Sequence, residues 1–247
     1  MKIVFSRKGF DSAAGGGPSP IVDGRPVSLP IPDSKGLSPT TYAARGVGDL
    51  VEAATRGRVR RDALCHDDPM FLPDGTCVFG QCGGAQTHLD RQGVGIGDVF
   101  LFFGWFRDPD GEDHHRIFGY QRIAQIVRLA SADETTLARF RAHKHPHAFG
   151  FHHGNRSDTL YVGPGKTAQT APPGLRLTAP GATRSLWRVP RWLRDVGLTY
   201  HADPKRWPAP DRLRSAAQGQ EFVADITNSS EAHNWFNSTL AAIHAEP

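Results

Sequence analysis

The chain has 247 residues, 38% hydrophobic and 22% charged, a balance ordinary for a folded protein with a sizeable core. It contains no apolar run near the roughly 20 residues that cross a bilayer and no signal-peptide pattern, so we expect a cytoplasmic protein without a membrane partner. The net charge of +4 allows nucleic-acid or phosphorylated ligands without requiring them, and the three cysteines form neither a disulfide framework nor a C-x-x-C zinc motif.

The N-terminal third combines one predicted strand with turns and a helix. Residues 2–6 predict a short buried strand, which a glycine-rich turn follows. Prolines at alternating positions in 27–33 favour an edge strand or a polyproline segment. Apolar residues at i, i+3, i+4 and i+7 predict a helix over 47–56, and the polar segment 62–92 is expected to be loop-like.

The clearest signal is a hairpin. The apolar run 99–106 predicts a strand buried on both faces, and a polar turn separates it from an alternating strand over 116–127. The remaining predicted elements are a helix over 133–143, strands over 159–162 and 175–177, and a terminal helix from Ser230.

This mixture of elements, with 27 glycines and 19 prolines, predicts an α+β fold in a single domain spanning residues 1–247. The hairpin region 93–128 is similar in pattern to the small β-barrels of the PUA, ASCH and EVE group, which bind RNA or modified bases. We therefore expect a mixed sheet or a small PUA/ASCH-like β-barrel core with peripheral helices. The sequence does not indicate an oligomeric state.

The first candidate site is the loop after the first strand. Ser6, Arg7, Lys8 and Asp11 stand beside Gly15–Gly17, and glycine lets a backbone approach an anion closely. This pattern suggests that the loop holds a phosphate or another polar ligand. The alternative is a turn with exposed charges and an Arg7–Asp11 salt bridge.

The second candidate consists of two polar motifs, Cys65-His66-Asp67-Asp68 and Gln81-Cys82-Gly83-Gly84-Ala85-Gln86-Thr87-His88. A thiol, imidazoles and carboxylates can serve as nucleophile, base and orienting group, or can bind iron or zinc. In the alternative, His66 and Asp67 cap turns and Cys82 is a small buried side chain. The predicted catalytic residues are His66, Asp67, Cys82 and His88, and Gln81 and Gln86 are predicted to bind ligand.

The third candidate is rich in histidine. In the run from His143 to His147, three imidazoles at alternating positions could converge, although a solvated basic loop is the simpler interpretation. A second group, His152 and His153, stands in a turn specified by glycines. The candidate metal ligands are therefore His66, Asp67, His88, His152 and His153.

A fourth polar motif lies near the C-terminal end of the printed sequence. Gln218 and Gln220 flank a glycine just before Glu221, and the two glutamine amides suit contacts with a base edge or a carbonyl. We predict that all three bind ligand.

Several of these motifs together resemble the third nucleotide-modification-associated domain family. The resemblance rests on residues 1–12 with 15–20, on 29–33, on the Cys65-His66-Asp67 and Gly80–Gln86 motifs, and on the segments 98–107 and 218–222. It covers nearly the whole chain and implies nucleotide or nucleic-acid chemistry. It assigns no catalytic residue.

The leading hypothesis is therefore an enzyme that modifies a nucleobase, nucleotide or nucleic acid, with either a metal ion or a Cys/His pair supplying reactivity. The alternative is a non-catalytic reader that binds a modified base among Trp105, Phe106 and Tyr120. A third class, an enzyme acting on a small molecule unrelated to nucleic acid, also fits the modest charge.

Overall fold

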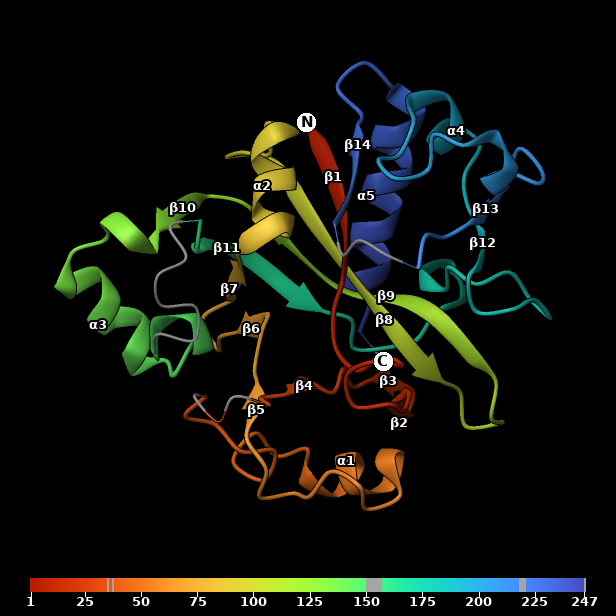
Figure 1. The fold of residues 1–247 in the computed structure, drawn as a ribbon. Helices are drawn as coiled ribbons and strands as arrows, with labels where there is room; N and C mark the ends of the chain where they lie inside the picture. Colours follow the sequence, from red (N-terminus) through yellow and green to blue (C-terminus); the bar gives the residue numbers. More distant parts are fainter. Residues whose placement is uncertain (35, 37, 150–156, 218–220, 247) are drawn as a thin grey trace.

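A computed structural model describes the chain except for residues 35, 37, 150–156, 218–220 and 247. Across the described residues, one mixed sheet forms the centre and five α-helices lie around it (Figure 1). The mixed α+β class expected from the sequence is thus confirmed.

The helices are α1 (Gly48–Thr55), α2 (Gly83–Arg91), α3 (Glu134–Ala142), α4 (Trp192–Val196) and α5 (Ser230–His244). The strands are β1 (Lys2–Arg7), β2 (Ser19–Val22), β3 (Arg25–Pro26), β4 (Ile31–Pro32), β5 (Cys65–His66), β6 (Met70–Phe71), β7 (Thr76–Gln81), β8 (Val99–Arg107), β9 (Asp113–Arg122), β10 (Gln125–Arg128), β11 (Thr159–Thr167), β12 (Leu186–Arg188), β13 (Arg212–Arg214) and β14 (Glu221–Asp225).

The main sheet has the strand order β14-β1-β8-β9-β11-β7-β6. Strand β1 runs parallel to β8 and antiparallel to β14, so that Ser6 near the end of β1 lies opposite Glu221 at the start of β14. The sheet curls strongly. Four strands separate β14 from β7, yet the Gln81 amide at the end of β7 donates a 2.7 Å hydrogen bond to the Glu221 carboxylate.

Alternate residues of the central strands are buried on opposite faces of the sheet, as the period of two in a β-strand requires. Ile3, Phe5 and the odd-numbered residues 99–103 pack with residues of α4 and α5. Val4 and the even-numbered residues 100 and 102 pack on the other face with Leu89 of α2. The prediction that 99–106 is a strand buried on both faces is confirmed.

Three of the predicted helices are confirmed as α1, α3 and α5. Asp133 and Ser229 cap α3 and α5 by accepting hydrogen bonds from backbone N–H groups in the first turn. The loop-like interpretation of 62–92 was wrong, because this segment forms β5, β6, β7 and α2. These strands are short, and two glycines begin the helix, so neither periodicity nor propensity marks them. The strand predicted at 175–177 was also wrong, since a 3₁₀ turn occupies Pro173–Leu175.

No helix in the described part of the chain combines the length and the apolar character that crossing a membrane requires.

Candidate functional site

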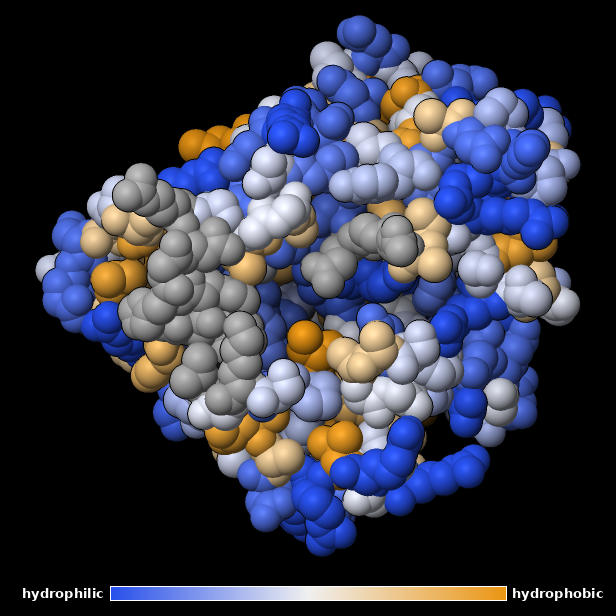
Figure 2. Space-filling model, viewed as in Figure 1, coloured by the Kyte–Doolittle hydropathy of each residue, from blue (hydrophilic) through white to orange (hydrophobic). Residues whose placement is uncertain are grey.

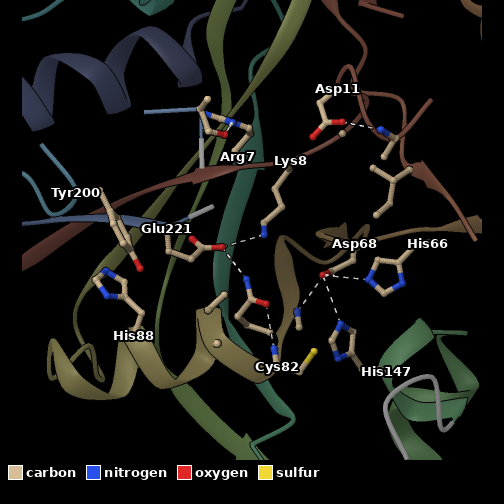
Figure 3. Close-up of a pocket in the computed structure, with 18 residues that line it drawn as sticks. Arg7, Lys8, Asp11, His66, Asp68, Cys82, His88, His147, Tyr200 and Glu221 are labelled. Carbon is tan, nitrogen blue, oxygen red and sulfur yellow. Dashed lines mark hydrogen bonds and ion pairs between the residues drawn. The ribbon is translucent and has the colours of Figure 1, made fainter. Parts of the chain in front are cut away.

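A cavity of about 780 Å³ lies where β1, β5, β7 and β14 end or begin. Its lining includes the residues after β1, the junction of β7 with α2, and the segments before β14 (Figure 3). Figure 2 shows this face of the molecule hollowed near its centre, with hydrophilic residues in the hollow. The curl of the sheet therefore gathers residues from distant parts of the sequence into one polar cavity.

Glu221 is the centre of a buried hydrogen-bond network on one side of the cavity. Its Oε1 atom accepts hydrogen bonds from Ser6 Oγ at 3.1 Å, Lys8 Nζ at 3.0 Å and Gln81 Nε2 at 2.7 Å. The residue is only 1% exposed, and its Oε2 atom has no hydrogen-bond partner among the described residues. One carboxylate oxygen is thus fully used by the protein, and the other is buried without a donor from the part of the chain that the structure describes.

The position of Lys8 depends on a close approach of two backbones. The Lys8 N–H donates to the carbonyl of Phe103, and a Cβ atom on Gly104 would lie 2.7 Å from the Lys8 carbonyl oxygen. The Lys8 ammonium group also lies 4.3 Å from the centre of the Phe79 ring, a favourable cation–π contact. A glycine at position 104 is therefore needed for this arrangement.

His66, Asp68 and His147 form a cluster on the other side of the cavity, and one ligand atom from each lies within 4.8 Å of the others. The Asp68 Oδ2 atom is 3.7 Å from His66 Nε2 and 3.8 Å from His147 Nε2. Both distances exceed hydrogen-bond range. They are close to the spacing of two ligands that each lie about 2 Å from one ion.

A second layer of contacts orients this cluster. The Asp68 Oδ1 atom accepts a hydrogen bond from Gly80 N–H and lies 3.4 Å from His145 Nε2, which leaves Oδ2 facing the two imidazoles of the cluster. His147 Nδ1 lies 2.6 Å from Asp158 Oδ1. If Nδ1 donates to this carboxylate, the Nε2 lone pair is directed at the cluster, as in carboxylate–histidine–metal triads.

The charge states of the cluster suit metal binding. Burial alone would raise the pKa of Asp68, but the nearby imidazoles of His145, His66 and His147 lower it far below its usual range. Burial lowers the pKa of His147, although Asp158 and Asp68 oppose this effect. An ionised carboxylate and a neutral imidazole are the forms that bind divalent metal ions.

Cys82, His88 and Tyr200 line the cavity near α2. Cys82 is the residue before the helix, and Gly84 and Ala85 in the first turn also face the cavity. The His88 ring packs on Tyr200 with 4.6 Å between ring centres, and its Nε2 atom lies 3.2 Å from Thr199 Oγ1. Burial lowers the pKa of His88 against the opposing charge of Glu221, which favours the neutral, proton-accepting form.

The remaining predicted site residues have diverse positions. Asp67 binds Arg45 at 2.9 Å and lines a second cavity of about 350 Å³. Gln86 is buried and bonds to Tyr161 and Asp90. Asp11 lines the main cavity while it accepts N–H hydrogen bonds from its own turn. The predictions for Gln218, Gln220, His152 and His153 fall outside the described residues.

Arg7 and His201 both bind the backbone at the edge of the cavity. Its guanidinium donates hydrogen bonds to the carbonyl oxygens of Ala216 and Ala217. His201 Nε2 accepts a hydrogen bond from Ala216 N–H, while its Nδ1 atom lies 2.8 Å from the Thr199 carbonyl oxygen. Both side chains thus fix the segment that leads toward β14.

His201 makes the stability of the fold dependent on pH. Burial, opposed by the Thr199 carbonyl, lowers the pKa of His201 to about 4. The unfolded chain, with an ordinary histidine pKa near 6.5, therefore binds more protons below pH 6.5 than the folded chain. We therefore expect His201 alone to lower the free energy of unfolding by about 2 kcal/mol when the pH falls from 7 to 5.

Urea unfolding at the two pH values, with wild type, His201→Gln and the exposed control His143→Gln, measures this effect. The His201→Gln variant should show a smaller loss on acidification, and the control should follow wild type. Equal losses in all three proteins would contradict the assignment.

The sequence analysis placed Asp68 and His147 in candidate motifs but assigned neither of them a role, and it did not name Tyr200. A signal existed for Asp68, because residues two apart in an extended chain share a face, and His66 and Asp68 are two apart. The solvated-loop interpretation of 143–147 does not fit, since His145 and His147 are buried. Nothing in the sequence around Tyr200 indicated a role.

The fold and the cavity define an α+β protein with a polar cavity rich in histidine and carboxylate side chains. The family model for nucleotide modification associated domain 3 matches residues 2–225. The chain therefore belongs to this family, and the resemblance noted in the sequence is confirmed. Membership implies a role in nucleotide modification and interaction with nucleotides or nucleic acid. Comparisons with curated proteins and with solved structures found no significant match.

Proposed function

We propose that the protein is an enzyme that modifies the base of a nucleotide or nucleic acid in the main cavity, with a transition-metal ion held by His66, Asp68 and His147. The observation that carries the proposal is the convergence of these three ligand atoms within 4.8 Å at the cavity wall. Two imidazoles and a carboxylate are a ligand set that suits iron and zinc. A bound ion of this kind acts as a Lewis acid or lowers the pKa of a bound water.

The protein's own groups have roles around that centre. Asp158 holds the His147 imidazole in one orientation, and Gly80 N–H holds the Asp68 carboxylate. His88, whose lowered pKa keeps it neutral, is placed to accept a proton from a bound molecule. Cys82 lines the same cavity and is the candidate nucleophile of a metal-independent route.

The purified chain, stripped of metal and dialysed against zinc or ferrous ion, tests the proposal. We expect about one equivalent of ion in wild type and in the exposed control His143→Ala, and none in His147→Ala. The loaded protein is then incubated with mononucleotides and with DNA, and the recovered bases are measured by mass spectrometry. A changed base mass that appears with wild type and not with His147→Ala supports the enzyme. Unchanged base masses with every protein, or an ion that His147→Ala retains, argue against the proposal.

A non-catalytic reader of modified bases is the second candidate function. The observation that favours it is the Glu221 Oε2 atom, which has no hydrogen-bond partner among the described residues and can bind a ligand without any reaction. The aromatic residues first expected to bind the base are not at this site: Phe106 is buried in the core, Tyr120 bonds to His244, and Trp105 lies under Arg184. The PUA- or ASCH-like barrel that would accompany such a reader stays a prediction. Tight binding with unchanged base masses supports the reader.

A further inference from the structure

We propose that Glu221, Lys8 and Tyr200 form a base-reading subsite, in which a nucleobase stacks on Tyr200 and donates an N–H to Glu221 Oε2. This inference rests on the proposed function, since it requires a nucleotide in the cavity. It adds which part of the nucleotide is recognised and by which atoms.

The first argument is the asymmetry of the Glu221 carboxylate. Three protein donors converge on Oε1, whereas Oε2 has no hydrogen-bond partner among the described residues and is shielded from solvent. A buried carboxylate oxygen without a donor is costly, and a carboxylate can only accept hydrogen bonds when ionised. The ligand group that fits this atom is therefore an N–H or O–H donor.

The second argument is the charge balance of the pair. Lys8 and Glu221 form an ion pair in which both side chains are largely buried, at 10% and 1% exposure. The Lys8 charge is thus largely compensated, so the pair is poorly suited to a phosphate. Because an ammonium group has three N–H donors, Lys8 can still donate to a ligand acceptor beside Glu221 Oε2. An adjacent donor and acceptor are what the Watson–Crick edge of a nucleobase presents.

The third argument is the conformation of Tyr200. This residue is 50% exposed at the cavity and has a φ of +66°, which is rare for a bulky side chain. Hydrogen bonds from Thr199 N–H to Val223 and from His201 N–H to Leu198 hold the backbone on both sides of it. Costly conformations of this kind concentrate at ligand sites, and an exposed aromatic ring is a stacking surface for a base.

Figure 3 shows how these groups are placed. Tyr200, His88 and Glu221 lie on one side of the cavity, His66, Asp68 and His147 lie on the other, and Lys8 points between them. A base held at Glu221 therefore extends toward the imidazole–carboxylate cluster. The recognising side chains and the proposed reactive centre come from different elements but face one volume.

The first experiment measures how tightly the wild-type protein binds different nucleotides. Calorimetry with dAMP, dCMP, dGMP and dTMP identifies the preferred base. The preferred nucleotide is then compared with an analogue without the N–H donor: purine for adenine, 2-pyrimidinone for cytosine, 1-methylhypoxanthine for guanine or 3-methylthymine for thymine. We expect wild type to bind the analogue about tenfold or more weakly, as for the loss of a hydrogen bond to a charged group.

Variants then assign the effect to residues. Glu221→Gln should bind the nucleotide and its analogue with nearly equal affinity. Tyr200→Ala should weaken every nucleotide by about tenfold, whereas Tyr200→Phe and the exposed control Ile96→Ala should match wild type. If Glu221→Gln does not fold, the ligand comparison on wild type still decides.

Repeating the titration with a single-stranded trinucleotide separates the two sources of such a base. Tighter binding of the trinucleotide indicates a base within a nucleic-acid strand, and equal binding indicates a free nucleotide. Equal wild-type affinity for the nucleotide and its donor-free analogue overturns the subsite but leaves the proposed function standing. Failure of wild type to bind any nucleotide or trinucleotide overturns both.

Discussion

Replacing Asp68 by asparagine is expected to abolish metal binding, while the same change at Asp67 leaves it intact. In Asp68→Asn the amide oxygen keeps the hydrogen bond from Gly80 N–H, which places the amide NH₂ group toward His66 and His147. An NH₂ group is a donor and cannot ligate a metal ion. The loss of affinity should be at least about 100-fold, the upper end of what losing a second-shell partner costs.

Asp67→Asn is a matched control because it makes the same chemical change one residue away. Asp67 instead binds Arg45, and its carboxylate is absent from the metal-ligand cluster. Metal content by mass spectrometry and competitive titration with a chromophoric chelator measure both variants. Retention of the ion by Asp68→Asn, or its loss from Asp67→Asn, would show that the ligand set is wrong.

Gly80→Ala should remove the ion without replacing any of its proposed ligands. A Cβ atom on Gly80 would lie 2.3 Å from His147 Cδ2 and 2.5 Å from His147 Nε2, so the imidazole must move away. Gly80 in β7 is paired with Leu160 of β11, so the backbone cannot shift freely, and overpacking of this kind costs about 1–3 kcal/mol of stability. We expect a lower melting temperature together with a loss of stoichiometric metal binding.

Gly95→Ala is the corresponding control, because a Cβ atom there meets nothing within 4 Å and the residue has no positive φ. Both variants are compared by thermal unfolding and by metal titration. A Gly80→Ala protein that binds the ion as tightly as wild type would mean that His147 is not a ligand.

The sequence predicted the parts of this fold that have long periodic patterns and the family to which the chain belongs. The apolar run 99–106 and the terminal helix correspond to β8 and α5. The junction of β7 with α2 was missed, because six residues of strand followed by a glycine-rich helix start give no periodic signal.

For the site, the sequence pointed to Lys8, His66, Cys82 and Glu221, all of which line the main cavity. It pointed to Asp67 rather than Asp68, because the sequence does not show which of two neighbouring carboxylates faces the cavity. Which residues meet depends on the curl that brings β7 to β14, and no local pattern contains that information. The catalytic and ligand-binding roles of these residues remain predictions for the experiments above.

The curl of the sheet also has a consequence for the order of assembly during synthesis. His66 lies in β5, Asp68 lies just after it and His147 lies in the 3₁₀ turn Pro146–Phe149, none of which pairs with β14. All three residues are made before the ribosome reaches residue 221. Glu221 pairs with Ser6 more than 200 residues earlier in the sequence, and such distant contacts form late because of the entropy of closing the loop. The nascent chain thus contains the residues of the proposed metal cluster before it gains Glu221, the group proposed to select a base.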